Sequence, residues 1–344
     1  MKKRNHTREG SGLFGQLFSQ LFNQLFKPLF RPIQLVLMLA VTLVSGFSNA
    51  ESRAAAAVSG QYNFDSGGLT RSYLLHVPKQ LAQGATLVIV MHGYTSSASN
   101  IMAYSGMNDV ADEKGFVVVY PQGTIDQRGN AFFNVGYEFH AESEVDDIQF
   151  IRDLTAHLQS ELALDPNKTF ATGMSNGADM SYLLACQAAD LFRAVAPIAG
   201  IMMKEIFETC SPSRPLPIFE VHGTKDNVSL FNGDMENSGG WGPYLDLPAT
   251  IALWVDLNNL TETQTRELPD NAANDGSHIV FDRYWSESSD NEVWFYKVID
   301  GGHHWPGAHI DWWRSPSAWW YFRSSNQDIN TSRVVWSFFE SMSD

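Results

Sequence analysis

TFATGMSNG, residues 169–177, is the stretch of this 344-residue chain that decides the fold prediction. Its first four residues favour a buried strand, and the apolar segment that continues to about Ala188 favours a helix. Gly173 and Gly177 allow a sharp turn that lifts the hydroxyl of Ser175 above the edge of a sheet. This strand-turn-helix setting predicts that Ser175 is a nucleophile. The alternative is an ordinary glycine-rich turn in which Ser175 caps the helix.

Apolar runs on both sides of this stretch predict further strands. The runs cover residues 85–91, 116–120, 169–172, 194–197, 216–221 and 293–298. Continuous runs of this kind are typical of parallel strands that are buried on both faces. Apolar residues that recur every three or four positions from Ile148 to Leu162 predict an amphipathic helix, and Asp328 to Met342 predict another. The alternation predicts a single-domain α/β fold with a mostly parallel central sheet flanked by helices.

The nucleophile needs a base and an acid, which in a fold of this type follow the serine in the order acid, then histidine. The loop after the run 216–221 contains Asp226, and the loop after the run 293–298 contains His303. We therefore predict that Ser175 attacks the substrate, that His303 is the general base and that Asp226 orients the base.

Neighbouring residues offer alternatives to this assignment. His304 is a second candidate for the base, and Asp234 and Asp246 are reserve candidates for the acid, although they are more typical of solvated surface charges. A metal site made of His303, His304 and His309 is a further alternative. Adjacent residues of an extended segment point to opposite sides, and no carboxylate or cysteine spacing completes a ligand set. We expect no metal and no cofactor.

The oxyanion that forms when a serine attacks a carbonyl group needs backbone N–H donors. In this fold one donor belongs to the residue after the nucleophile, and the other belongs to the loop after an earlier strand. We predict Asn176 and Tyr94 as these donors, with Gly93 permitting a close approach. His92 precedes the nucleophile in the chain, which is the wrong order for a base in this fold, so we expect it to support the loop.

Several stretches make the chain resemble the polyhydroxybutyrate-depolymerase-type esterases of the α/β-hydrolases, a family that includes feruloyl esterases. They are MHGYTSSASN, YPQGT, VDDIQFIRDL, ATGMSNGADMSYLLAC, FRAVAPIAG, CSPSRPLPIFEVHGTKD, WVDLNNLTETQTRELPD and DGGHHWPG. The resemblance implies a serine esterase with the triad and oxyanion donors given above. It also implies that Cys186 and Cys210, which stand where similar proteins carry cysteines, form one disulfide, since an even pair in an exported chain is typically bridged. Two separate buried thiols are the alternative.

The tryptophans are unevenly distributed, because all 10 lie after residue 240. Trp305 closely follows the proposed base, and Trp312 and Trp313 belong to an aromatic segment before the last helix. We predict that Trp305, Trp312 and Trp313 contact the substrate as part of an exposed aromatic patch at the mouth of the cleft. The alternative is that the rings pack this segment onto the sheet.

Residues 1–50 differ in composition from the rest of the chain. A positive start with Lys2 and Lys3 is followed by the apolar run 33–47 and by small residues that end at Ala50. The apolar run is shorter than the roughly 20 residues that a membrane-spanning helix needs. We predict an export signal over residues 1–50, a catalytic domain over residues 51–344, a periplasmic or extracellular location, and no stable membrane anchor after signal removal. The Leu-Phe repeat within residues 13–30 has no assigned role.

The charge balance, 23 Lys and Arg against 38 Asp and Glu, excludes nucleic acid as a partner, because phosphate neutralisation needs clustered cations. A peptidase would use the same triad, but no acidic clamp for a substrate amine is evident. A binding protein on a hydrolase scaffold would normally lack a triad member. We predict a secreted serine esterase that cleaves hydroxyalkanoate polyesters or their oligomers through an acyl-enzyme. The alternative is a feruloyl or acetyl (xylan) esterase acting on plant cell-wall polysaccharide.

Overall fold

The computed structural model describes residues 58–308 and 325–343, which belong to one compact unit. The predicted export segment lies outside the described residues, as do His309, Trp312 and Trp313. No helix within the described ranges is both long enough and apolar enough to cross a bilayer.

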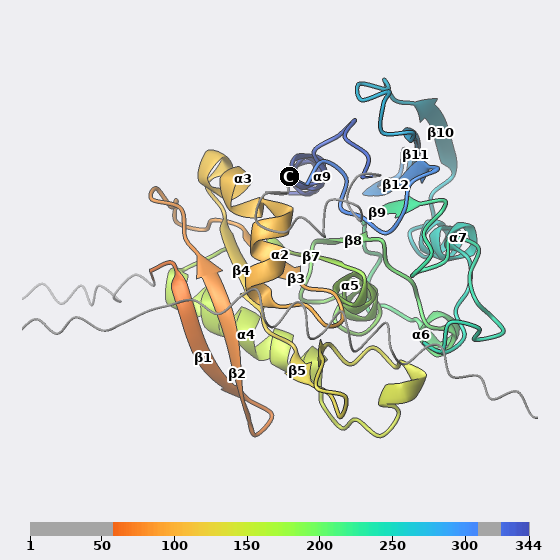
Figure 1. Ribbon diagram of the computed structural model, residues 1–344. Helices are drawn as coiled ribbons and strands as arrows, with labels where there is room; N and C mark the ends of the chain where they lie inside the picture. Colours follow the sequence, from red (N-terminus) through yellow and green to blue (C-terminus); the bar gives the residue numbers. More distant parts are fainter. Residues whose placement is uncertain (1–57, 309–324, 344) are drawn as a thin grey trace, which may run out of the picture. The chain divides into compact units, whose positions relative to one another are not determined.

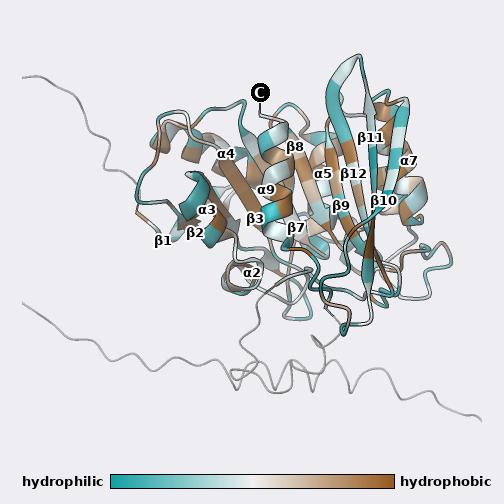
Figure 2. Ribbon diagram, turned by 90° about the horizontal axis from the view of Figure 1, so that it is seen from above, coloured by the Kyte–Doolittle hydropathy of each residue, from teal (hydrophilic) through white to brown (hydrophobic). Residues whose placement is uncertain are grey.

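A 10-stranded sheet forms the centre of the described part (Figure 1). In spatial order its strands are β1 (Gly60–Ser66), β2 (Leu69–His76), β4 (Val117–Pro121), β3 (Leu87–Met91), β7 (Thr169–Met174), β8 (Ala194–Ile198), β9 (Ile218–Gly223), β12 (Ser289–Ile299), β11 (His278–Ser286) and β10 (Glu262–Glu267). The strands from β4 to β12 are parallel to one another, which confirms the predicted α/β sheet. Figure 2 shows the central strands as largely hydrophobic, in keeping with burial on both faces.

The two edges of the sheet are antiparallel, which the apolar runs did not predict. β1 and β2 form a hairpin that pairs with β4, while β10 and β11 extend the sheet beyond β12. All residues of β10 are exposed, and its sequence ETQTRE contains no apolar residue. A charged, polar edge strand of this kind resists pairing with another chain. Along the chain β10 and β11 come between β9 and β12, although β12 is the strand that pairs with β9.

Helices cover both faces of the sheet. They are α2 (Ala98–Ser105), α3 (Met107–Lys114), α4 (Asp147–Leu162), α5 (Asn176–Gln187), α6 (Lys204–Thr209), α7 (Leu247–Leu257) and α9 (Thr331–Ser341). Buried residues of α4, α5 and α7 share one apolar cluster, whereas those of α2, α3 and α9 share the other. The predicted helices over 148–162 and 328–342 correspond to α4 and α9. The side chains of Asp146 and Asn330 accept hydrogen bonds from the first turns of these two helices, which fixes where they begin.

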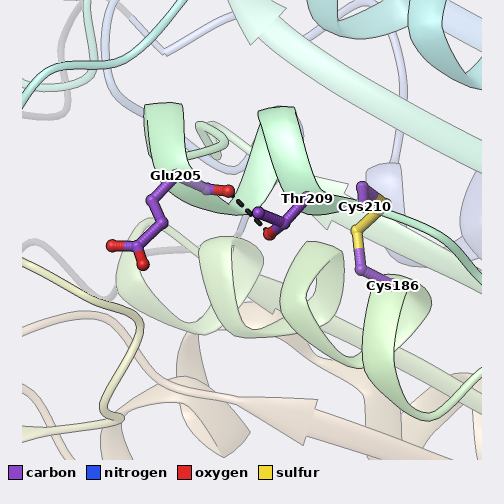
Figure 3. The surroundings of a disulfide bond; sticks show 4 residues. All are labelled: Cys186, Glu205, Thr209 and Cys210. Atoms are coloured by element: carbon purple, nitrogen blue, oxygen red, sulfur yellow. Dashed lines mark hydrogen bonds between the residues drawn. A yellow bond between two sulfur atoms is a disulfide. The ribbon is translucent and has the colours of Figure 1, made fainter.

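A disulfide joins Cys186, near the end of α5, to Cys210, directly after α6 (Figure 3). The expected pairing is thus present, with the two Cα atoms 5.0 Å apart. The bridge spans a sequence separation of 24, and restricting a loop of that length in the unfolded chain stabilises the fold by about 3 kcal/mol. It anchors the end of α5 that is remote from Ser175.

Candidate active site

Ser175 occupies the turn between β7 and α5 with φ 55° and ψ −124°. A residue other than glycine rarely adopts such a backbone, which costs on the order of 1–3 kcal/mol. Neighbouring main-chain bonds hold the turn in place: the N–H of Ser175 donates to the carbonyl of Ile198 at 3.0 Å, and its carbonyl accepts from Ala178 and Asp179. The turn keeps the Ser175 side chain partly exposed at the end of β7.

The two glycines of the turn are required by close backbone approaches. A Cβ atom at Gly177 would lie 2.3 Å from the carbonyl oxygen of Met91, and one at Gly173 would lie 2.5 Å from the carbonyl oxygen of Gly177. Either contact is far shorter than van der Waals packing allows. The glycines therefore let α5 start directly against the end of β3, as the G-x-S-x-G setting predicts.

Asp226 and His303 meet at the same edge of the sheet, in the loops after β9 and β12. The Nδ1–H of His303 donates to Oδ2 of Asp226 at 2.7 Å, and both residues are buried. The other carboxylate oxygen accepts from the main-chain N–H groups of Val228 and Ser229 at 2.8 and 2.9 Å. Burial raises the pKa of Asp226, but the charges of His303 and His222 and these hydrogen bonds outweigh it and hold the pKa below its ordinary value. The carboxylate is ionised.

Hydrogen bonds join the loop after β9, which contains Asp226, to the loop after β12, which contains His303. The N–H of Lys225 donates to the carbonyl of Gly301 at 2.9 Å, and the N–H of Thr224 donates to Val298 at 2.9 Å. A Cβ atom at Gly223 would lie 2.4 Å from the carbonyl oxygens of Gly301 and Gly302. Because β7, β9 and β12 are parallel members of one sheet, their carboxyl ends bring Ser175, Asp226 and His303 to one edge.

The loop after β3 lies against the nucleophile. A Cβ atom at Gly93 would be 3.3 Å from Cβ of Ser175 and 3.8 Å from its Oγ. Tyr94 is held by its hydroxyl, which donates to Asp126 at 2.7 Å and accepts from the side chain of Asn130 at 2.8 Å. This arrangement fixes the main chain of Tyr94 beside Ser175.

Asn176 is fixed from its side chain as well as by its place in α5. Its Oδ1 accepts from the N–H of Phe133 at 2.7 Å, and its Nδ2 donates to the carbonyl of Phe133 at 2.9 Å. Within the described ranges, neither the main-chain N–H of Asn176 nor that of Tyr94 donates a hydrogen bond. Two preorganised donors beside a partly exposed serine suit the binding of an oxyanion.

His92 supports this loop, in agreement with the sequence analysis. Its Nδ1–H donates to the carbonyl of Gly93 at 2.8 Å, and its Nε2 accepts from the N–H of Gly123 at 3.0 Å. Burial lowers the pKa of His92 to about 4, so the ring is neutral near neutral pH. A neutral ring with both nitrogens engaged holds two backbone segments together and is not a catalytic base.

Comparison with known proteins agrees with this fold. The fold matches the acetyl xylan esterase from Aspergillus awamori with a TM-score of 0.52 at 15% identity, over 77% of this chain and 99% of that one. The chain thus has an α/β-hydrolase fold. A family model of the prolyl oligopeptidase family matches residues 102–232, which include the nucleophile turn.

Two curated relatives of this chain have names that state a substrate. Feruloyl esterase B of Piromyces equi is 32% identical over 193 residues, which are 55% of this chain and 35% of that protein. Poly(3-hydroxyalkanoate) depolymerase C of Paucimonas lemoignei is 27% identical over 225 residues, 65% of this chain and 52% of that protein. The chain thus spans about a third of the first relative's length and half of the second's.

The prediction that Trp305 is exposed at the mouth of a cleft was wrong. Trp305 is 1% exposed and belongs to the apolar cluster shared by α2, α3 and α9. Its indole N–H donates to the hydroxyl of Ser332 at 3.2 Å, and its main-chain N–H donates to the hydroxyl of Tyr104 at 3.1 Å. The chain turns inward after the base, so Trp305 packs the core instead of lining a cleft. The predicted contacts Trp312 and Trp313 lie outside the described residues.

An aromatic group that the sequence analysis missed lies beside the proposed oxyanion donor. The rings of Tyr94, Phe139 and Trp241 are partly exposed and mutually in contact, with centroids 5.6 to 5.8 Å apart. Phe139 also lines a cavity of about 240 Å³, together with Arg128 and other residues. We call Tyr94, Phe139 and Trp241 the aromatic cluster. Phe139 belongs to a short 3-10 helix, Glu138–His140, and the other two residues come from separate loops, so no local motif in the sequence predicts the cluster.

Asp234 and Asp246, the reserve candidates for the acid, have other roles in the structure. Asp234 accepts from the N–H groups of Ser238 and Gly239, and Asp246 caps α7 by accepting from Ala249 at 2.7 Å. Asp234 is buried, so the expectation of a solvated charge was wrong for it. Burial, together with the charge of His303, lowers the pKa of His304 to about 4. Within the described ranges, no group of three or more His, Cys, Asp or Glu could hold a metal ion.

Proposed function

We propose that this protein is a serine carboxylic ester hydrolase that works through an acyl-enzyme. The observation that carries the proposal is the 2.7 Å bond between Asp226 and His303 at the sheet edge where the strained Ser175 turn projects. A bound carboxylate is the partner that an imidazole needs in order to act as the base for a serine. The esterase names of the relatives support an ester as the substrate.

Each residue has one task in the proposed reaction. Ser175 Oγ attacks the ester carbonyl carbon while His303 Nε2 takes the hydroxyl proton, and Asp226 stabilises the imidazolium through Nδ1–H. The N–H groups of Tyr94 and Asn176 bind the tetrahedral oxyanion. The imidazolium returns its proton to the departing alcohol, which leaves an acyl group on Ser175. Water, deprotonated by His303, then attacks the acyl carbon. The bond from that carbon to Ser175 Oγ breaks, Oγ recovers the proton from His303, and the acid product leaves.

Hydroxyalkanoate polyesters or their oligomers are the proposed substrate class, supported by the depolymerase relative and by the sequence motifs. The alternative is a feruloyl or acetyl ester of plant cell-wall polysaccharide. The aromatic cluster favours a feruloyl group in particular, since Phe139 and Trp241 offer partly exposed ring faces beside the oxyanion donor Tyr94.

Export belongs to the same proposal. We propose that residues 1–50 direct export and that residues 51–344 form the catalytic domain. The disulfide between Cys186 and Cys210 supports an oxidising compartment outside the cytoplasm.

The test compares the wild-type protein with Ser175→Ala on amorphous polyhydroxybutyrate and on methyl ferulate, with release of soluble acid as the measurement. We expect turnover of at least one ester by the wild type and near-complete loss in the variant. An organophosphonate should label Ser175 in the wild type. Turnover of ferulate alone would select the cell-wall alternative. A wild type that neither hydrolyses an ester nor accepts the label contradicts the proposed function.

A further inference from the structure

A line of buried polar groups continues from the proposed acid into the core. Nδ1 of His222 lies 3.0 Å from Oε1 of Glu220, and Oε2 of Glu220 accepts from the hydroxyl of Tyr182 at 2.9 Å. On its other side, Nε2 of His222 lies 2.8 Å from the carbonyl oxygen of Ser229 and 3.4 Å from Oδ2 of Asp226. The side chains of Glu220, His222 and Asp226 are all 0% exposed. Of these groups, only Asp226 has a task in the proposed reaction.

The hydrogen-bond partners fix the protons on the His222 ring. A carbonyl oxygen only accepts, so Nε2 must carry a proton to bond with Ser229. Oε1 of Glu220 also lies 3.4 Å from the N–H of Gly200, and Oε2 accepts from Tyr182, so this carboxyl group is surrounded by donors. Such surroundings favour a carboxylate, which places the remaining proton on Nδ1. With Glu220 ionised, the ring has two N–H donors and a positive charge.

Opposing effects act on the pKa values of this pair, and the charged ring prevails. Burial works against a charged imidazole, but the hydrogen bond and charge of Glu220, together with the charge of Asp226, hold the pKa of His222 above its ordinary value. Burial raises the pKa of Glu220 to about 7, while its bonds with His222, Tyr182 and Gly200 act in the opposite direction.

Two imidazole rings thus flank a single carboxylate oxygen. Oδ2 of Asp226 accepts from His303 at 2.7 Å and faces Nε2–H of His222 at 3.4 Å. Ser229 connects the same groups, because its N–H donates to Asp226 and its carbonyl accepts from His222. Asp226 is consequently held by His222 and Ser229 as well as by His303.

We propose that His222, held in its charged form by Glu220, is a positioning residue that orients Asp226 and limits how strongly Asp226 stabilises protonated His303. This inference rests on the proposed function. A positive charge beside Asp226 weakens the attraction between the carboxylate and the imidazolium. The charge on His222 thus opposes the protonated form of His303 and favours the neutral ring that acts as the base.

Other charged groups face His222 from the neighbouring elements. Asp179 on α5 accepts from the hydroxyl of Tyr137 and the N–H of Ile201, and burial raises its pKa to about 7. On β12, Lys297 is beside His222 in the strand register and pairs with Asp282 at 2.6 Å. Lys297 is thus already neutralised, and Asp179 is farther along the network than Glu220. Replacing the His222 ring therefore removes the positive charge nearest to Asp226.

The test measures kcat/KM against pH for the wild type, His222→Gln and a matched control, His76→Gln. Glutamine can preserve a donor near the Nε2 position but carries no charge. His76 also pairs with a carboxylate, Asp112, at 2.9 Å, but it is on β2, far from β9 in the strand order. We expect the midpoint of the acid limb to move upward by about 1 pH unit in His222→Gln, with KM nearly unchanged. We expect no movement in His76→Gln.

A second variant and a spectroscopic measurement guard against misfolding. Glu220→Gln removes the partner that keeps His222 charged, so the acid limb should move in the same direction. In the wild type, ¹⁵N NMR should show both ring nitrogens of His222 protonated at pH 7. A neutral His222 ring, or an unmoved acid limb in a folded His222→Gln protein, would overturn the inference. Ester turnover and Ser175 labelling by the wild type test the proposed function separately.

Discussion

The two sides of the Ser175 turn each contain a buried histidine, yet the two rings differ in charge. His92, on the oxyanion side, contacts only neutral partners, and burial lowers its pKa to about 4. His222, on the acid side, contacts two carboxylates, which outweigh burial and raise its pKa. The comparison shows that a buried imidazole takes its charge from its hydrogen-bond partners, not from burial alone. The oxyanion side of the turn presents fixed dipoles, whereas the acid side presents charged side chains.

The largest effect should come from removing charge on the acid side. Asp226→Asn should lower kcat by about 10⁴-fold, because an amide cannot hold the His303 ring in the tautomer that accepts the serine proton. The matched control is Asp234→Asn, a buried carboxylate outside the proposed triad that accepts from the N–H groups of Ser238 and Gly239. Steady-state kinetics on one soluble ester measures both. Equal losses in the two variants would contradict the assignment of Asp226.

On the oxyanion side, His92→Phe should lower kcat about 10- to 100-fold without moving the acid limb. The variant leaves the N–H of Gly123 without its acceptor, which costs about 1–3 kcal/mol. It also removes the ring that holds Gly93 against Ser175. The pH profile is the deciding measurement, because an acid limb that moves as it does in His222→Gln would erase the distinction between the two sides.

Stability should depend on pH with opposite signs on the two sides. The pKa of His92 is lowered from 6.5 to about 4, so its contribution is complete above pH 6.5 and is lost as the pH falls toward 4. The pKa of Asp179 is raised from 3.8 to about 7, so its contribution is complete at low pH and is lost as the pH rises through 7.

Thermal unfolding at pH 4 to 8 measures these contributions. Asp179→Asn should flatten the decline between about pH 4 and 7, whereas His92→Phe should flatten the loss below pH 6.5. The shift for His92 corresponds to about 3 kcal/mol over the full range. Melting curves that change identically in both variants would show that the sides do not differ in this way.

The smallest effect concerns the aromatic cluster, which lies only on the oxyanion side. Trp241→Ala should raise KM for methyl ferulate about 3- to 10-fold, since stacked aromatic contacts contribute about 0.5–1.5 kcal/mol. KM for an acetyl ester should change less, because an acetyl group does not reach a ring. The matched control is Trp285→Ala on β11, outside the cluster. A uniform change for both esters would rule out recognition of an aromatic group.

The sequence was most informative where a residue pattern has a single structural explanation. Apolar runs located the parallel strands, and the order of Ser175, Asp226 and His303 matched three loops at one sheet edge. Strand β10 was not predicted, because ETQTRE contains neither an apolar run nor an alternation of apolar and polar residues. Trp305 was misjudged because proximity to the base in sequence does not determine which way a ring points. The aromatic cluster joins residues far apart in the chain, so only the fold brings it together.

Glu220 is a signal that was present and not used. It is a charged residue in the middle of the apolar strand IFEVHG, where a carboxylate is costly unless it is paired. His222 follows two positions later, on the same side of the strand. That pair alone predicts a buried ionic interaction next to the loop of Asp226. The 3.4 Å approach to Oδ2 required the loop geometry.

The interlocking of the two loops has a consequence for biosynthesis. Gly223 and Thr224 pack against residues 298–302, so the base can reach the acid only after β12 has paired with β9. β12 is the last strand of the described chain, and the nucleophile turn precedes it by more than a hundred residues. A nascent chain therefore carries Ser175 through the synthesis of more than a hundred further residues before His303 can reach Asp226. The proposed hydrolytic activity arises only when β12 docks onto β9.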